Sequence, residues 1–249
     1  MTLDLGRSTA LVTGGARGIG RELTRQLVAR GASVIVVGRN MEHLKAVQAE
    51  HPQAVTVRAV DLACAQEVDR LVADLAATAP QINILINNAG VQYETDLFTP
   101  ERDQLTALAR REIATNLDSV VTLTLGLLPV IARHRHGAIV NISSGLAIAP
   151  KAASPVYCAT KAAVRSFTKA LGYQCARQAP HVEVSEAIMA LVDTDMTRGR
   201  GSGKIRAEQA ASEVLSVLDR HRPEVWVGKA RLLRLINRIS PALSEKIMR

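Results

Sequence analysis

The stretch Thr9-Ala10-Leu11-Val12-Thr13-Gly14-Gly15-Ala16-Arg17-Gly18-Ile19-Gly20 decides the fold of this 249-residue chain. A short apolar run leads directly into glycines at positions 14, 18 and 20, and a helical pattern follows. Strand, tight turn and helix in this order are typical of a dinucleotide-binding turn, because the glycines let the backbone approach a pyrophosphate at a helix N-terminus. We therefore expect Gly14, Gly18 and Gly20, with Arg17 and Ile19 between them, to bind a cofactor.

Downstream of this turn, apolar runs alternate with helical patterns. We expect further strands at 33–37, 54–60, 82–86, 137–142, 181–186 and 224–227, and helices at 19–30, 41–50, 65–78, 102–128, 155–176 and 206–220. The apolar runs are continuous, as in strands covered by helices on both faces. The sequence thus predicts an α/β, single-domain Rossmann fold with a doubly wound, mostly parallel seven-stranded sheet. This domain covers 1–227 and includes a Gly-rich loop at 192–204, interpreted as a mobile lid; a basic amphipathic extension covers 228–249.

The composition narrows the class of protein. Hydrophobic residues make up 47% of the chain and charged residues 22%, which suits one α/β domain with a substantial core. Cys64, Cys158 and Cys175 are odd in number and lack C-x-x-C spacing, so we predict neither a disulfide framework nor a metal site. With no signal peptide or long apolar span evident in the sequence, we expect a cytoplasmic protein.

The net charge of +8 is concentrated near the C-terminus. Six basic residues and one acidic residue lie between Gly228 and Arg249, so this segment supplies +5 of the total. The remainder resembles no base-reading module, and we expect no nucleic-acid partner. Leu232, Leu235, Ile236, Ile239 and Leu243 recur at helical spacing among the arginines. Such a helix either packs on its own domain or a partner subunit, which we favour, or lies on anionic lipid.

The end of the second strand bears on the choice of dinucleotide. The chain reads Gly38-Arg39-Asn40 there, without the acidic residue that would accept hydrogen bonds from a ribose 2′-hydroxyl. Arg39 can instead pair with a 2′-phosphate, and Arg17 lies on the same side of the site. We predict NADP(H) as the preferred cofactor, with NAD(H) as the alternative.

A second motif pairs a phenol with an ammonium. Tyr157 and Lys161 in Tyr157-Cys158-Ala159-Thr160-Lys161 lie on one helix face, where the cation would favour the phenolate. An isolated Y-x-x-x-K is more often part of an ordinary amphipathic helix, so other segments must decide whether this pair is catalytic. Those segments are the glycine turn, Asn87-Asn88-Ala89-Gly90 and Asn141-Ile142-Ser143-Ser144. Together, in this order and spacing, they resemble the classical short-chain dehydrogenase/reductase family from about Ser8 to Val227.

The resemblance implies a proton-handling unit of four residues. Tyr157 would be the general acid or base, Lys161 would lower the pKa of Tyr157 and bind the nicotinamide ribose, Ser144 would hold the substrate oxygen, and Asn116 would keep a proton-relaying water in place. Ser143 competes with Ser144 for its role, although the family spacing favours Ser144. Without the resemblance, Asn116 could equally cap or kink its helix, and the serines could simply end a strand.

The resemblance also implies further cofactor contacts and an activity. Asp61, followed by Leu62, would meet the adenine; Asn88, Ala89 and Gly90 would pack on the cofactor, and Thr194 would reach the carboxamide. Asp61 could alternatively cap the next helix. The implied function is an NADPH-dependent ketoreductase or alcohol dehydrogenase acting on a small carbonyl or secondary alcohol, and the alternative is a non-catalytic NADP(H)-binding sensor or scaffold. A homodimer or homotetramer formed through the long helices of the second half is expected.

The substrate side departs from the family pattern. Met189-Ala190 replaces the usual Pro-Gly or Pro-Pro pair, so that Met189, with Gln92 and Leu146, is a candidate substrate contact. In the loop, Arg198, Arg200 and Lys204 either meet an anionic substrate or, as we favour, are solvated. Four stretches, 87–92, 144–147, 155–161 and 191–194, resemble a bacterial subgroup that is grouped with the D-alanine esterification of teichoic acids, which leaves the substrate open.

Overall fold

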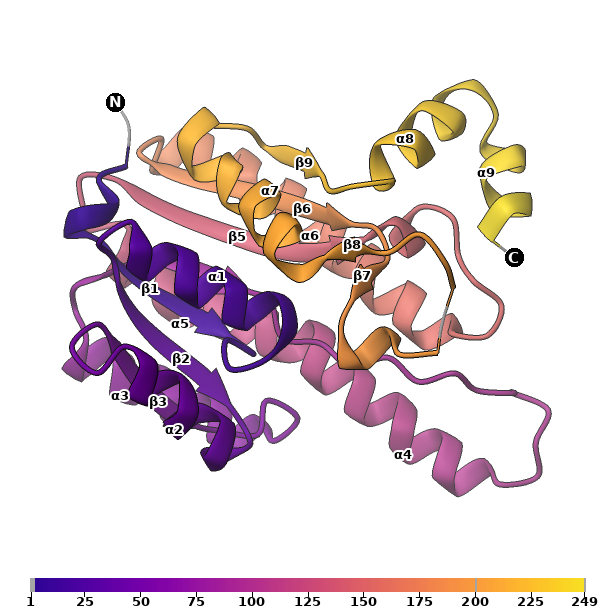
Figure 1. Cartoon of the computed structure of the whole chain (residues 1–249), viewed down its shortest axis with the longest axis horizontal. Coiled ribbons are helices and arrows are strands. Elements are labelled where there is room, and N and C mark those ends of the chain that lie inside the picture. Colours follow the sequence, from indigo (N-terminus) through magenta and orange to yellow (C-terminus); the bar gives the residue numbers. More distant parts are fainter. Residues whose placement is uncertain (1–2, 200, 249) are drawn as a thin grey trace.

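The fold is a seven-stranded sheet in which every strand is parallel to its neighbours (Figure 1). A computed structural model describes residues 3–199 and 201–248. The strand order is β3-β2-β1-β4-β5-β6-β9. The strands are β1 (Thr9–Thr13), β2 (Ser33–Gly38), β3 (Val55–Ala59), β4 (Ile82–Asn87), β5 (Gly137–Ser144), β6 (Val182–Met189) and β9 (Glu224–Trp226). The order reverses between β1 and β4, which is where open α/β sheets bind ligands. The predicted Rossmann fold is confirmed.

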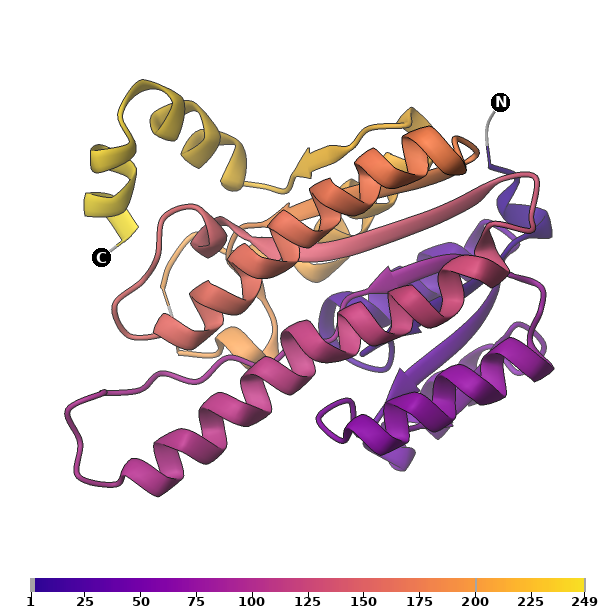
Figure 2. The same ribbon diagram turned by 180° about the vertical axis from the view of Figure 1, so that it is seen from behind.

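Helices cover both faces of the sheet. The helices are α1 (Gly18–Ala29), α2 (Met41–Glu50), α3 (Ala65–Thr78), α4 (Arg102–Ile113), α5 (Ser119–Ile131), α6 (Pro155–Gln178), α7 (Ala207–Arg220), α8 (Ala230–Ile239) and α9 (Pro241–Met248). One core cluster packs α1, α2 and α7 on one face, and a second packs α3, α5 and α6 on the other. Figure 2 shows α6 and the α4–α5 region in front of the sheet. This burial on both faces explains why the strands are continuously apolar.

Two strands run at least two residues further than the sequence pattern predicts. β5 continues through Ser144 and β6 through Met189, because these residues pair in register at the carboxyl edge of the sheet. The predicted strand 181–186 stops at Glu186, although the next three residues are apolar. In the structure Glu186 lies inside β6 and is 1% exposed.

The predicted lid contains a small two-stranded sheet of its own. Two short strands, β7 (Val192–Asp193) and β8 (Ile205–Arg206), pair in parallel, and a 3-10 turn covers Asp195–Thr197. Arg198 pairs with Asp195, and Lys204 Nζ donates to the Thr197 carbonyl at 2.5 Å. Arg198 is exposed, as expected of a solvated cation, whereas Lys204 is mostly buried and bound within the lid. Arg200 lies outside the described residues.

The C-terminal helices lie beyond the carboxyl edge of the sheet (Figure 1). On α8, Ala230 and Leu233 are buried, whereas Leu232, Leu235 and Ile239 are 58%, 58% and 86% exposed. The expectation that the apolar face packs on its own domain is therefore met only along one edge. Packing against a partner subunit stays a prediction.

One helical stretch among the described residues, Arg102–Ile131, is long and apolar enough to cross a membrane by length and composition alone. Charged residues interrupt its first half, so that no continuous apolar span is evident in the sequence. Its second half contributes Leu123, Leu127 and Ile131 to the core, each fully buried. We therefore interpret it as a core helix.

Candidate active site

The glycine turn between β1 and α1 has the shape of a cofactor cradle. Gly14 has φ +64°, which favours glycine, and its amide donates to the Val37 carbonyl at 2.7 Å. A Cβ on Gly20 would lie 2.0 Å from the Gly14 carbonyl oxygen. The Asn88 amide and its side chain bind the Thr13 hydroxyl and carbonyl at 3.0 and 2.9 Å. The Asn88-Ala89-Gly90 turn is thereby fastened to the glycine turn, as the sequence analysis expects of two parts of one site.

The start of the lid lies against this turn. A Cβ on Gly18 would stand 3.2 Å from Thr194 Cγ2. Arg17 forms an ion pair with Asp195, and this pairing holds the pKa of the Asp195 carboxyl below its usual range. Arg17 and Thr194 are thus brought together with the glycines. Arg17, however, is engaged by the lid, so Arg39 is the more accessible cation for a 2′-phosphate.

The ends of β2 and β3 lie side by side and carry Arg39 and Asp61. Arg39 is exposed, whereas Asp61 Oδ2 lies 2.9 Å from an Arg111 amino nitrogen. Asp61 Oδ1 also accepts from the Ala63 amide at 3.1 Å. Burial works to raise the pKa of Asp61, but the Ala63 amide and the guanidinium together lower it. Asp61 does not cap the following helix, whose N-cap is Cys64.

Lys161 is the most deeply buried cation of the site. It is 4% exposed, and its ammonium donates to the Ile142 carbonyl at 2.8 Å. Burial disfavours the charged form and lowers the pKa of Lys161 to about 8. The same nitrogen lies 5.8 Å from the centroid of the half-buried Tyr157 ring. The two side chains thus lie on one face of α6, as their spacing predicts.

Asn116 lies where the long helix loosens into a π-helical turn, Ala114–Asp118. Its side chain is fully buried and binds both backbone groups of Val91, accepting from the N–H and donating to the C=O at 2.8 Å each. A Cβ on Gly90 would meet Asn116 Oδ1 at 3.3 Å and Lys161 Nζ at 3.6 Å. Gly90, Asn116 and Lys161 therefore converge, and the glycine permits their approach. Turns of this kind are frequent at functional sites.

The two serines at the end of β5 have different surroundings. Successive strand residues point to opposite faces. Ser143 donates to the Glu186 carboxylate beneath the sheet edge, whereas the Ser144 hydroxyl oxygen accepts from the Leu146 amide at 3.2 Å. Ser144 begins the turn Gly145–Ala147, which packs against α6. This geometry favours Ser144 over Ser143 as the substrate-facing serine.

The three candidate substrate contacts differ in their exposure. Leu146 is half-buried on the turn after Ser144, and Gln92 donates to the Ser154 hydroxyl at 3.1 Å. Met189 is 7% exposed and belongs to the core cluster on the α1 and α7 face. The extension of β6 turns this side chain toward the core, and its contact with a substrate stays a prediction.

Three charged side chains near the site escape the motif analysis. Arg111 reaches Asp61 from a position 50 residues later. Glu112 is 2% exposed and accepts from the Tyr93 amide at 3.1 Å, and burial raises the pKa of its carboxyl. Arg165, one turn beyond Lys161 on α6, binds Glu186. Only the helical spacing of Arg165 from Lys161 could have drawn attention to any of them.

The residues present fit a nicotinamide dinucleotide. A Cβ on Gly20 would clash with the Gly14 carbonyl oxygen, and one on Gly90 would stand tightly against Asn116 Oδ1, so that the glycines keep backbone exposed along the cradle. Lys161 offers a buried ammonium, which suits a neutral hydroxyl group of a ribose. Among the described residues, no cluster of three or more His, Cys, Asp or Glu side chains could hold a metal ion.

Comparison with known proteins agrees with this geometry. Residues 8–204 match the family model described as short chain dehydrogenase. The chain is 35% identical over 196 residues to the uncharacterized oxidoreductase DltE of Bacillus subtilis, covering 79% of this chain and 76% of that protein. It is 30% identical over 195 residues to the 3-oxoacyl-(acyl-carrier-protein) reductase FabG of Rickettsia bellii, covering 78% and 77%.

A solved structure extends the likeness over the whole chain. A short-chain dehydrogenase from Burkholderia cenocepacia J2315, in complex with NADP, superimposes with a TM-score of 0.85. The two are 26% identical, and the match covers 99% of each chain. The likeness to the Bacillus protein agrees with the subgroup resemblance seen in the sequence.

Proposed function

Because this chain belongs to the short-chain dehydrogenase family and is an oxidoreductase of that type, we propose that it is NADPH-dependent and acts on a small carbonyl or secondary alcohol. The observation that carries the proposal is the convergence of Gly90, Asn116 and Lys161 at the carboxyl ends of β4 and β5, one helical turn from Tyr157. A buried ammonium beside a phenol, at the switch point of a dinucleotide-binding sheet, suits proton transfer next to a cofactor.

Tyr157 and Lys161 handle the proton. The bound cofactor supplies the hydride for reduction, or accepts it in oxidation. Tyr157 donates its phenolic proton to the carbonyl oxygen in reduction and takes a proton from the alcohol in oxidation. The Lys161 ammonium, 5.8 Å from the ring, favours the phenolate that this exchange produces. With a pKa of about 8, Lys161 is mostly charged at neutral pH.

Ser144 and Asn116 supply geometry. The Leu146 amide donates to Ser144 Oγ, which orients the hydroxyl so that its proton can be donated to the substrate oxygen. Asn116 pins Val91 through two hydrogen bonds and thereby fixes the neighbouring Gly90 beside the ammonium. In this arrangement Asn116 holds the turn against Lys161, where a water can pass protons onward.

Cofactor preference is assigned to Arg39. This exposed guanidinium stands at the end of β2, where the 2′-position of the adenosine ribose lies in dinucleotide-binding folds. It can form charge-assisted hydrogen bonds with a 2′-phosphate. The dehydrogenase from Burkholderia cenocepacia was solved with NADP, which supports this choice.

The assembly that we propose is a cytoplasmic homodimer or homotetramer. The long helices expose large apolar side chains, including Leu125 at 59% and Tyr173 at 69%. Burial of such groups in a partner subunit would stabilise an oligomer. Sedimentation velocity of the purified chain measures the mass, and a monomer at all concentrations would contradict this part of the proposal.

Titration of NADPH and of NADH into the purified protein, followed by cofactor fluorescence, tests the function. We expect tight NADPH binding and, on addition of a panel of ketones, ketone-dependent oxidation of NADPH. Binding without turnover of any carbonyl or alcohol would instead favour the non-catalytic sensor. A preference for NADH would contradict the role of Arg39 and leave that of Tyr157 intact.

A further inference from the structure

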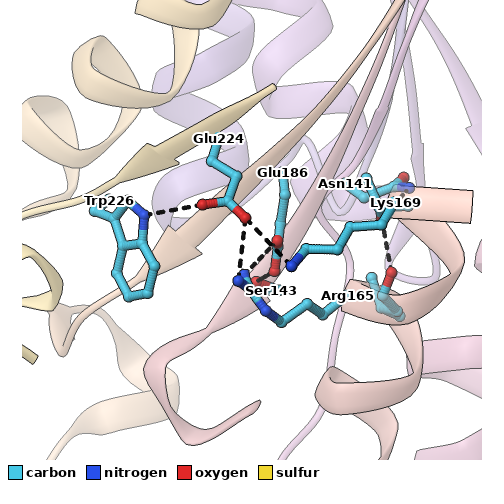
Figure 3. A network of polar contacts seen from close by, with 9 residues as sticks. Asn141, Ser143, Arg165, Lys169, Glu186, Glu224 and Trp226 are labelled. Carbon is cyan, nitrogen blue, oxygen red and sulfur yellow. Dashed lines mark hydrogen bonds and ion pairs between the residues drawn. The ribbon is translucent and has the colours of Figure 1, made fainter. Parts of the chain in front are cut away.

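A buried ion pair fastens the helix that carries Tyr157 and Lys161 to the sheet (Figure 3). Arg165 follows Lys161 by four residues on α6 and so lies on the same helix face. Its Nη1 lies 2.5 Å from Glu186 Oε2 on β6. The Glu186 side chain is 1% exposed and that of Arg165 18%. A carboxylate buried this deeply requires its partner, so the pair fixes α6 relative to β6.

The same carboxylate also holds the end of β5. Ser143 donates its hydroxyl proton to Glu186 Oε1, while Arg165 occupies Oε2 (Figure 3). Ser143 directly precedes Ser144, whose backbone pairs with Met189 at the end of β6. Glu186 is therefore one group that binds both the strand carrying Ser144 and the helix carrying Tyr157.

The network continues to the edge of the sheet. Arg165 Nη2 lies 3.0 Å from Glu224 Oε1, and the Trp226 indole donates to Glu224 Oε2 at 3.2 Å (Figure 3). Arg165 also stacks over the Trp226 ring at 5.7 Å from its centroid, and Arg234 of α8 lies 5.5 Å from the same centroid. Two carboxylates and the ring thus fix the planar guanidinium of Arg165 in orientation as well as position.

We propose that Glu186 and Arg165 are positioning residues, which hold Ser144 Oγ and the Tyr157 hydroxyl so that both reach one substrate oxygen. The inference rests on the proposed function. The two hydroxyl groups come from separate elements, and the bond from Lys161 to the Ile142 carbonyl at 2.8 Å is one tie between these elements. A misplacement of about 1 Å can reduce turnover by about 100-fold, so a second contact that fixes α6 relative to β5 would help to maintain turnover.

A role in stability alone does not explain this choice of residues. Well-packed apolar side chains commonly serve a fold as well as a buried ion pair does, or better. Unlike apolar packing, the contacts of Glu186 are directional, because one carboxylate oxygen binds Ser143 on β5 and the other binds Arg165 on α6. Ser144 and Tyr157 need such a fixed relative geometry.

Steady-state kinetics on Glu186→Gln, alone and combined with Ser144→Ala, tests the proposal. The amide keeps the shape and can still accept from Ser143, but it cannot pair with Arg165 as a charge. We expect kcat to fall by about 10- to 100-fold, with the Kd of NADPH changed less than about twofold. In the Ser144→Ala background the same change should cost at least about threefold less than in the parent chain, because only the placement of the Tyr157 hydroxyl is then left to disturb. Equal losses in both backgrounds, or an unchanged kcat, would overturn the proposal.

Two further variants separate a loss of positioning from a general loss of stability. Arg165→Met combined with Glu186→Gln removes both charges, so the fold retains no unpaired buried ion, and we expect the same loss of kcat. Asp219→Asn is the matched control, since it breaks an ion pair with Arg30 at 3.1 Å that lies on the other face of the sheet. Its kcat should stay within about twofold of the parent chain.

Amide hydrogen exchange gives a readout that does not need turnover. The Leu146 amide donates to Ser144 Oγ, and it should exchange at least about 10-fold faster in the charge-free double variant than in the parent chain or in Asp219→Asn. If the parent chain reduces no carbonyl, the proposed function fails while this measurement still decides the inference. Unchanged protection of Leu146 would overturn it.

Discussion

Replacement of Lys161 by Met should stabilise the folded chain at neutral pH, and the advantage should shrink as the pH rises. Burial lowers the pKa of Lys161 from 10.5 to about 8. Between these values the unfolded chain holds a proton that the folded chain has lost, so the stability of the parent chain rises with pH. At 1.36 kcal/mol per pKa unit, burial of the ammonium costs about 3 kcal/mol below the folded pKa. Methionine has a similar length and no charge, so that its own contribution is independent of pH.

Urea unfolding of the parent chain and of Lys161→Met measures the effect. The difference in their free energies of unfolding should fall by about 2 kcal/mol between about pH 7 and about pH 9.5. Lys45→Met is the matched control, because Lys45 is exposed on α2 and its difference from the parent should stay constant. If the Lys161→Met difference were independent of pH over this range, the ammonium would not be desolvated, and its assigned role beside Tyr157 would lose its physical basis.

Other perturbations address the cofactor cradle and the turn beside it. Arg39→Ala should raise the Kd of NADPH by about 10- to 100-fold in a fluorescence titration and leave that of NADH unchanged, since only the 2′-phosphate contact is lost. Gly20→Ala should abolish binding of both dinucleotides and lower the melting temperature, because its Cβ would lie 2.0 Å from the Gly14 carbonyl oxygen; unaltered binding in calorimetry would be inconsistent with the cradle. Asn116→Ala should cost about 1–3 kcal/mol of unfolding free energy and lower kcat, because two partly buried backbone groups of Val91 lose their partner; full activity in steady-state assays would argue against its role.

The fold was accessible from the sequence because its signals are local. The apolar runs and the glycine turn lie within short stretches, and they predict each strand of the seven-stranded sheet to within a few residues, whereas β7 and β8 of the lid are not predicted. β6 is the instructive exception. The prediction ends it at Glu186, and nothing nearby in the sequence reveals that Arg165 and Ser143 satisfy this carboxylate inside the strand.

The site residues likewise fall into those that local spacing predicts and those that only the tertiary fold brings together. Tyr157, Lys161 and the glycines follow from spacing, whereas the pairing of Arg111 with Asp61 spans 50 residues and depends on the tertiary fold. The pairing of Met189 with Ser144 at the end of β6, which buries the Met189 side chain, likewise depends on strand register. Motifs alone therefore do not predict interactions that depend on strand register.

The most direct measurement is the turnover of Tyr157→Phe with NADPH and a carbonyl substrate that the parent chain reduces. Loss of the phenolic proton should lower kcat by about 100- to 10,000-fold. The Kd of NADPH should change by less than about twofold, since the ring remains packed beside Lys161. Retention of turnover with intact cofactor binding would show that Tyr157 is not the proton donor, and would contradict the proposed chemistry.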